Sequence, residues 1–206
     1  MKRFILKNLT LVTVIASLTA CGGGGKGKSA YTKLVDQGES QFATGSFADA
    51  RTSFNAAKLK NPNSATAYIG AAWCSMSLND IAAALADFQS GLSKTNINAD
   101  LYAGYAFALN ANGDFALSNQ RIDEALNADT DWELSYDGSL NVNDLRLAKA
   151  ENHFLLGQYT ESLAQVKLLN TSFNADVNTV SGRAALSVEI ERLRNALGKN
   201  IARIPA

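Results

Sequence analysis

The feature of this sequence that most constrains its fold is a repeat of 34 residues that begins at Tyr31. Three successive units, 31–64, 65–98 and 99–132, carry small residues at their eighth and twentieth places and a bulky apolar residue at the twenty-fourth. Small residues let two antiparallel helices approach closely, and the bulky residue fills the space beside the crossing. The repeat therefore predicts a stack of paired helices, each pair burying its apolar face on its neighbours. The three columns hold Gly38, Ala72 and Ala106; Ala50, Ala84 and Ser118; and Phe54, Phe88 and Ile122.

A tight turn is expected between the two helices of each unit. Glycine stands at the fifteenth place in Gly45 and Gly113, with an aromatic residue two places later, and the same pattern returns at Gly157. Counting back from Gly157 places a fourth unit at 143–176, displaced by an insertion of ten residues, 133–142. Such an insertion is expected to form a surface loop or, as the alternative, to contact a partner.

This pattern resembles the tetratricopeptide repeat (TPR), which asks for small residues at places eight and twenty, an aromatic residue at twenty-four and proline at thirty-two, here Pro62. The resemblance covers residues 31–170 and implies an all-α, helix-turn-helix solenoid of about four repeats. Residues 177–206 are expected to form a C-terminal capping helix and tail that cover the apolar end of the stack. Its apolar face is predicted to comprise Leu186, Ile190, Leu193 and Leu197.

The resemblance also implies a binding site, because the first helix of each TPR unit lines a concave groove that holds a peptide or protein partner. The residues at the groove places are mostly apolar, so we expect apolar anchors on the partner. The alternative is that these side chains pack against neighbouring helices as core. The candidate groove residues are Val35, Phe42, Ile69, Trp73, Met76, Phe107, Leu147 and Phe154, with Glu39, Ala103 and Glu151 at equivalent places.

The N-terminus has the layout of an export signal, residues 1–20, in which a basic start precedes the apolar stretch 9–20. The stretch ends in Leu18-Thr19-Ala20-Cys21, which resembles the lipobox of bacterial lipoproteins. The resemblance implies cleavage before Cys21 and attachment of a diacylglycerol to its thiol; the alternative is an ordinary cleavage that leaves the thiol free. Residues 21–30 would follow as a Gly-rich flexible tether. We therefore expect a protein held at a membrane by its lipids.

Motifs for enzyme chemistry are weak. Residues 22–29 fit the pattern of a phosphate-binding loop, but they follow a cysteine of the lipobox rather than a β-strand, so no nucleotide binding is expected. His153 has no metal-ligand partner at suitable spacing, and Cys74 is expected to be a buried apolar residue. With 19 basic and 19 acidic residues, the chain lacks the charge of a nucleic-acid binder. We expect no enzyme activity and no cofactor. Acidic residues near the insertion do not fit the register of a calcium loop: Asp129, Asp131, Glu133, Asp137 and Asp144.

Together these features predict a membrane-anchored interaction scaffold of the bacterial cell envelope that binds an envelope protein or peptide in an apolar groove. Gly22 follows the cysteine in place of the aspartate that retains enteric lipoproteins in the inner membrane, so we expect the protein to be anchored in the outer membrane and to face the periplasm. Assembly of outer-membrane complexes is one process in which such a scaffold would act. Two alternatives stay open: a capture protein for a small apolar ligand or glycan, and an accessory subunit of a cell-wall enzyme.

Overall fold

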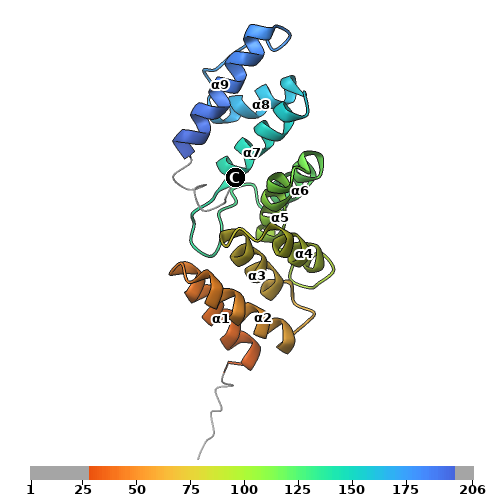
Figure 1. Cartoon of the computed structure of the whole chain (residues 1–206), viewed down its shortest axis with the longest axis vertical. Helices are drawn as coiled ribbons and strands as arrows, with labels where there is room; N and C mark the ends of the chain where they lie inside the picture. The colour runs from red at the N-terminus through yellow and green to blue at the C-terminus, as the bar shows by residue number, and fades with distance from the viewer. Residues whose placement is uncertain (1–27, 198–206) are drawn as a thin grey trace, which may run out of the picture.

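The computed structural model describes residues 28–197, which form nine helices and no strand. Successive helices pair antiparallel, and the pairs stack along the long axis of the molecule (Figure 1). Four pairs followed by a single terminal helix confirm the predicted all-α helix-turn-helix solenoid. The helices are α1 (Ala30–Ala43), α2 (Phe47–Lys60), α3 (Ala65–Ser77), α4 (Ile81–Gly91), α5 (Ala99–Asn112), α6 (Phe115–Ala128), α7 (Val142–Leu155), α8 (Tyr159–Leu169) and α9 (Val180–Leu197).

The first helix begins inside the segment that we predicted as a tether. Ser29 is the N-cap of α1, and its hydroxyl accepts a hydrogen bond of 3.1 Å from the backbone N–H of Thr32. The Lys28 ammonium lies 2.5 Å from a carboxylate oxygen of Asp36. A serine cap supplies a partner to a backbone donor that the helix leaves unpaired, which is why the helix starts here. The predicted signal, Cys21 and the tether up to residue 27 lie outside the described residues.

All four turns within the pairs have the same geometry. The residues at the fifteenth place, Gly45, Asn79, Gly113 and Gly157, have φ values of +77°, +58°, +86° and +73°. The residue after each one donates its N–H to a carbonyl five residues back, as Ser46 does to Gln41 at 2.8 Å. This is the Schellman motif, in which a left-handed residue ends the helix, and glycine adopts that conformation without a steric cost. The glycine column of the sequence is therefore explained by backbone geometry.

The first and second pairs are each locked to the next by a ring that inserts against glycine. The Phe54 ring of α2 is fully buried between Gly38 of α1 and Gly70 of α3. A Cβ atom built on Gly38 would lie 2.8 Å from this ring, and one on Gly70 would lie 2.5 Å from it. Phe88 of α4 makes the same kind of close approach to Gly104 of α5. The bulky column thus meets Gly38 of the small column within the first pair, and it meets Gly70 and Gly104, at the sixth place of their units, across the crossings to the next pair.

The terminal helix α9 packs against both α7 and α8 and closes the stack. Leu186, Ile190 and Leu193 of α9 are buried in a second apolar cluster that also contains Leu147 and Val166. Glu189 of α9 is buried, and its carboxylate is satisfied there: Asn170 donates to it at 2.8 Å and Arg192 forms an ion pair with it. The C-terminal helix therefore supplies the cap that a repeat stack needs.

Replacing Gly70 with alanine tests the ring-to-glycine contact. Alanine favours a helix over glycine by about 1 kcal/mol, yet we expect Gly70→Ala to destabilise the protein by about 1–3 kcal/mol because the buried ring has no room to move. Urea unfolding followed by circular dichroism measures the change.

The control for helix propensity is Ala164→Gly, at a site within α8 that is not buried. If Gly70→Ala raises the free energy of unfolding by about as much as Ala164→Gly lowers it, the close contact does not constrain the fold.

Candidate interaction surfaces on the concave face

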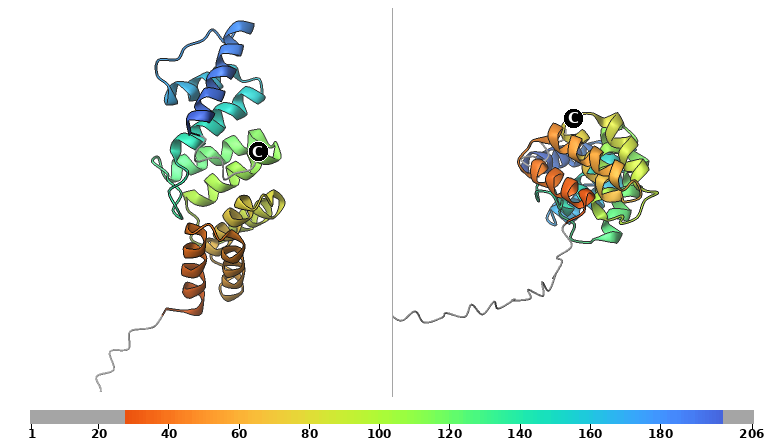
Figure 2. Two further views of the ribbon diagram at one scale, coloured as in Figure 1. Left: turned by 60° about the vertical axis from the view of Figure 1, so that its left-hand side comes forward. Right: turned by 90° about the horizontal axis from the view of Figure 1, so that it is seen from below.

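The insertion between α6 and α7 folds back onto the solenoid instead of projecting from it. Residues 132–140, here called the strap, run beside α5 toward α3 and α1 (Figures 1 and 2). Trp132, Leu134 and Leu140 are buried in the main core cluster. The Tyr136 ring lies 5.1 Å from the ring of Phe42, measured between centroids. The expected surface loop is therefore a packed segment, and it covers the first helices of the first three pairs.

One buried carboxylate anchors the strap. Asp100, at the second residue of α5, is 4% exposed. Its Oδ1 accepts a hydrogen bond of 2.8 Å from the Trp132 indole, and its Oδ2 accepts one of 2.5 Å from the Ser135 hydroxyl. The backbone carbonyl of Asp100 accepts a further bond of 3.1 Å from the Trp73 indole. Hydrogen bonds to a charged group are the stronger ones, so Asp100 fixes the strap against the helices.

Most of the predicted groove residues are core. Seven of the eight are less than a tenth exposed: Val35, Phe42, Ile69, Trp73, Met76, Phe107 and Leu147. Trp73 illustrates the cause, because its ring makes edge contacts with Phe88 at 6.1 Å and Phe107 at 6.2 Å while its N–H is bound to Asp100. The expected open apolar groove does not hold over α1, α3 and α5, since helix packing and the strap fill it.

The eighth residue, Phe154, marks a part of the concave side that stays open. It lines a pocket of about 420 Å³ between α7 and α9, here called the α7–α9 pocket. Leu155 and Val188 expose 61% and 70% of their surface there. Large apolar side chains left in water at a concave site are typical of contact surfaces. The pocket is lined by Glu151, Phe154, Leu155, Ser187, Val188, Ile190, Glu191 and Arg194.

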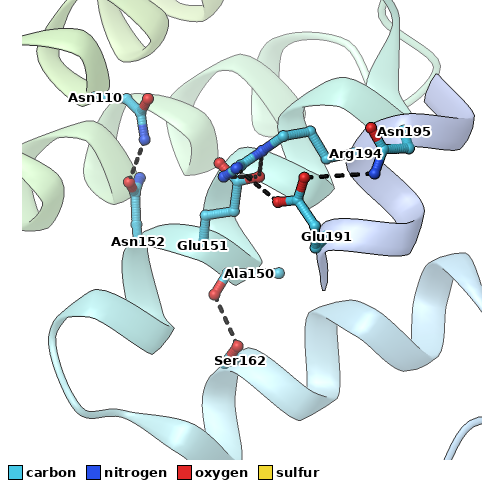
Figure 3. A network of polar contacts seen from close by, with 8 residues as sticks. All are labelled: Asn110, Ala150, Glu151, Asn152, Ser162, Glu191, Arg194 and Asn195. Carbon is cyan, nitrogen blue, oxygen red and sulfur yellow. Dashed lines mark hydrogen bonds and ion pairs between the residues drawn. The ribbon is translucent and has the colours of Figure 1, made fainter. Parts of the chain in front are cut away.

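Three charged residues of the pocket lining, Glu151, Glu191 and Arg194, form a network of ion pairs (Figure 3). Arg194 lies between Glu151, at 2.8 Å, and Glu191, at 2.9 Å. The Glu151 side chain is only 16% exposed. Burial raises the pKa of Glu151, while the charge and hydrogen bond of Arg194 lower it and Glu191 raises it. The pocket thus combines an apolar floor with a paired arginine whose side chain is half exposed.

Comparison with known proteins agrees with this architecture. No protein-family model and no curated protein matches the sequence. YrrB, described as a TPR protein with an unusual peptide-binding site, superposes with a TM-score of 0.59 at 15% identity, over 85% of this chain and 91% of its own. A TPR protein from Parabacteroides merdae gives a TM-score of 0.56 at 16% identity, over 84% of this chain and 68% of its own. A thermophilic TPR protein from Thermus thermophilus gives 0.52 at 16% identity, over 84% of this chain and 99% of its own.

This chain has a TPR-type fold. The small, bulky and glycine columns of the TPR pattern are the residues that make its crossings and turns. The third and fourth TPR units each contain the same internal hydrogen bond, in which the serine at the twentieth place donates to the backbone carbonyl at the eighth place. These bonds run from Ser118 to Ala106 at 2.8 Å and from Ser162 to Ala150 at 2.7 Å. Figure 3 shows the second of these bonds. The third and fourth TPR units are therefore built alike on both sides of the strap.

A buried amide network joins these two TPR units. Asn152 of α7 is fully buried; it accepts a bond of 2.6 Å from Asn110 and donates bonds of 2.9 Å to Ser118 and Asn119. Its neighbour His153 shares a hydrogen bond of 2.6 Å with Gln158 at the turn. This contact gives His153 a structural role at the turn between α7 and α8. A fully satisfied buried network holds neighbouring helices in one register.

The acidic residues near the strap serve local structure. Asp129, Asp137 and Asp144 each accept a hydrogen bond from a nearby backbone N–H, and Asp144 completes a capping box with Asn141 at the start of α7. Within residues 28–197 no group of three or more histidine, cysteine, aspartate or glutamate side chains is placed to hold a metal ion.

Two further observations concern the Cys74 thiol and the length of the helices. Burial raises the pKa of the Cys74 thiol to about 12, so this thiol lacks the thiolate character of a nucleophile. In the described part of the chain, no helix combines the length and the apolar character needed to cross a membrane.

Sequence reasoning missed Asp100 as a site residue. The signal was present, because Asp100 stands at the second place of its unit, which is one of the places that line a TPR groove. Its partners in the strap could not be found in the same way, since all of the strap except Trp132 lies outside the repeat and its path over the helices depends on tertiary contacts.

Titration of Tyr136 tests how deeply the strap is seated. Burial, and then the charges of Asp100 and Glu39, raise the pKa of its phenol well above 10. Above pH 10 the unfolded chain loses this proton while the folded chain keeps it, so stability falls as the pH rises through that window. We expect the ultraviolet absorbance of phenolate to show one late step that Tyr136→Phe abolishes, with neutral-pH circular dichroism unchanged. If Tyr136→Phe instead removes absorbance change near pH 10, where exposed tyrosines titrate, the Tyr136 phenol is not held in the groove.

Proposed function

We propose that this chain is a lipid-anchored scaffold of the bacterial cell envelope that binds a protein or peptide partner through the α7–α9 pocket. The proposal rests on the open apolar floor of that pocket, which Phe154, Leu155 and Val188 line together. The rest of the concave side is filled. An apolar side chain of a partner would lose its water contacts there.

The rim of the pocket supports recognition of a polypeptide. Arg194 and Glu191 are about half exposed and flank the apolar floor. Backbone carbonyls and charged side chains of a peptide are suitable partners for such groups, and a polar rim around an apolar centre is the usual anatomy of a protein interface. YrrB, of similar fold, is described as having an unusual peptide-binding site, which makes a peptide the first class of partner to test.

The anchor belongs to the same proposal and rests on the sequence. Leu18-Thr19-Ala20-Cys21 supplies the lipobox, and the Gly-rich stretch that follows leads to the first described residue, Lys28. The lipid would hold the solenoid at the periplasmic face of the outer membrane, in keeping with Gly22 after the cysteine. A tethered scaffold concentrates its partner at that surface, as outer-membrane complex assembly requires.

A second candidate function is capture of a small apolar ligand. The α7–α9 pocket has a volume of about 420 Å³, within the usual range of small-molecule sites. Such a ligand would bind the isolated solenoid saturably, with no protein partner. Partner capture and ligand capture therefore differ in whether a polypeptide is found at the pocket in cells.

Photocrosslinking from the pocket tests the scaffold. A photoreactive amino acid at Val188 should yield a discrete covalent adduct with one envelope protein in native cells, because this side chain is 70% exposed at the pocket. Mass spectrometry of the adduct identifies the partner, including a cell-wall enzyme if the chain serves as its accessory subunit.

The matched control is Val180, a valine of the same helix that is 76% exposed and does not line the pocket. We expect no adduct from this position. Equal adducts from Val180 and Val188, or none from either, would argue against a partner at the pocket.

Replacing the lipobox cysteine tests the anchor. In cells supplied with a fatty acid that carries an alkyne, the wild-type chain should take up the label and sediment with membranes, because each buried CH₂ of the lipid contributes about 0.8 kcal/mol. Cys21→Ser should lose both properties, whereas Cys74→Ser should keep them, since Cys74 is buried in the solenoid. Label on Cys21→Ser would overturn the assignment of the lipid to Cys21.

A further inference from the structure

We propose that the concave groove over α1, α3 and α5 is a second binding site, for a looped segment that carries an indole and a hydroxyl, and that the strap occupies it as an intramolecular ligand. A partner with such a segment then binds this groove by displacing the strap. This site is separate from the α7–α9 pocket.

The third and fourth units contact each other directly, without the strap. The third and fourth units keep the same internal serine bonds, Ser118 to Ala106 and Ser162 to Ala150, although the strap interrupts the chain between them. The network around Asn152 joins the two units directly. The strap therefore adds its apolar side chains to helix pairs that are already joined to each other.

The strap contacts the groove as a bound peptide would. Two backbone hydrogen bonds close it on itself, from Leu134 to Leu140 at 2.9 Å and from Gly138 to Leu134 at 2.8 Å. Its side chains reach the helices: Trp132 lies 6.3 Å from Phe107 between ring centroids, and Tyr136 lies against Phe42. Grooves gain affinity and specificity from side chains of a bound segment that fill their pockets.

Asp100 defines the chemistry that the groove selects. It receives an indole N–H from Trp132 and a hydroxyl from Ser135, so the strap supplies a donor to each of its carboxylate oxygens. A further side-chain donor, the Asn98 amide, lies at the longer distance of 3.4 Å from Oδ2. A buried carboxylate without donors is costly, which disfavours any segment that lacks them. The groove therefore selects a segment with tryptophan followed three residues later by serine or threonine, and then an aromatic residue.

The structure also provides a place where a competing segment can enter. A hollow of about 360 Å³ borders the anchor and is lined in part by Ile97, Asp100, Trp132 and Ser135. Ile97 exposes 36% of its surface there. An incoming indole can thus reach the edge of the anchor from solvent, and it takes the place of the Trp132 indole on Asp100 when that side chain leaves.

Binding in trans tests this site. In one variant of the full chain, residues 132–140 are replaced by nine glycine and serine residues; the probe is a fluorescein-labelled peptide with the sequence of residues 132–140. Fluorescence anisotropy should show binding to the variant at least tenfold tighter than to the intact chain. Adding Asp100→Asn to the variant should weaken binding about tenfold or more, because it weakens two hydrogen bonds to a charged acceptor.

Matched controls separate the groove from unspecific contacts. Asp49→Asn, at an exposed site on α2, should leave peptide binding unchanged. A peptide with alanine in place of Trp132 should bind at least tenfold more weakly. Equal binding of the probe to the intact chain and the variant, or no binding to a folded variant, would overturn the proposal, and neither result bears on the α7–α9 pocket.

Hydrogen exchange on the intact chain covers the case in which the variant does not fold. The amides of Leu134 and Gly138 should exchange at least tenfold faster than the slowest amides of α3 and α5, since a displaceable strap opens without global unfolding. Equal rates would make the strap part of the cooperative core and would overturn its role as a displaceable ligand.

Discussion

The insertion of an aromatic ring between glycines is the contact on which the stack depends. Phe54 fits between Gly38 and Gly70, and Phe88 approaches Gly104 in the same way one pair later. These crossings set the spacing of successive pairs, and the spacing places α1, α3 and α5 along one concave side. Every site on that side, including the seat of the strap, follows from it.

Filling of the concave side gives the two ends of the molecule different properties. Over α1, α3 and α5 the strap supplies Trp132, Leu134, Tyr136 and Leu140, and the apolar groove places become core. Beyond the strap, α9 covers α7 only in part, and the α7–α9 pocket stays open. One repeat pattern thus produces a filled groove at one end and an accessible pocket at the other.

Asp100 shows why a buried charge can be retained in an apolar groove. Its carboxylate accepts two side-chain donors from the strap, so its burial is offset by hydrogen bonds that a hydrophobic residue would not make. The consequence is selectivity, because the same carboxylate disfavours an occupant without donors. The amide network around Asn152 has the analogous role between the third and fourth pairs, where it specifies one register.

The sequence by itself determined the repeat architecture. Glycine in the left-handed turns and small residues at the crossings are local requirements that only a few residue types meet. The turns at Gly45, Gly113 and Gly157 could therefore be predicted from the sequence. The boundary of α1 was missed because the cap at Ser29 lies within a Gly-rich stretch. Only the tertiary structure decided which groove residues are accessible. Burial of Trp73 and exposure at Val188 depend on where the strap and α9 lie, and those positions arise from contacts between segments far apart in the chain.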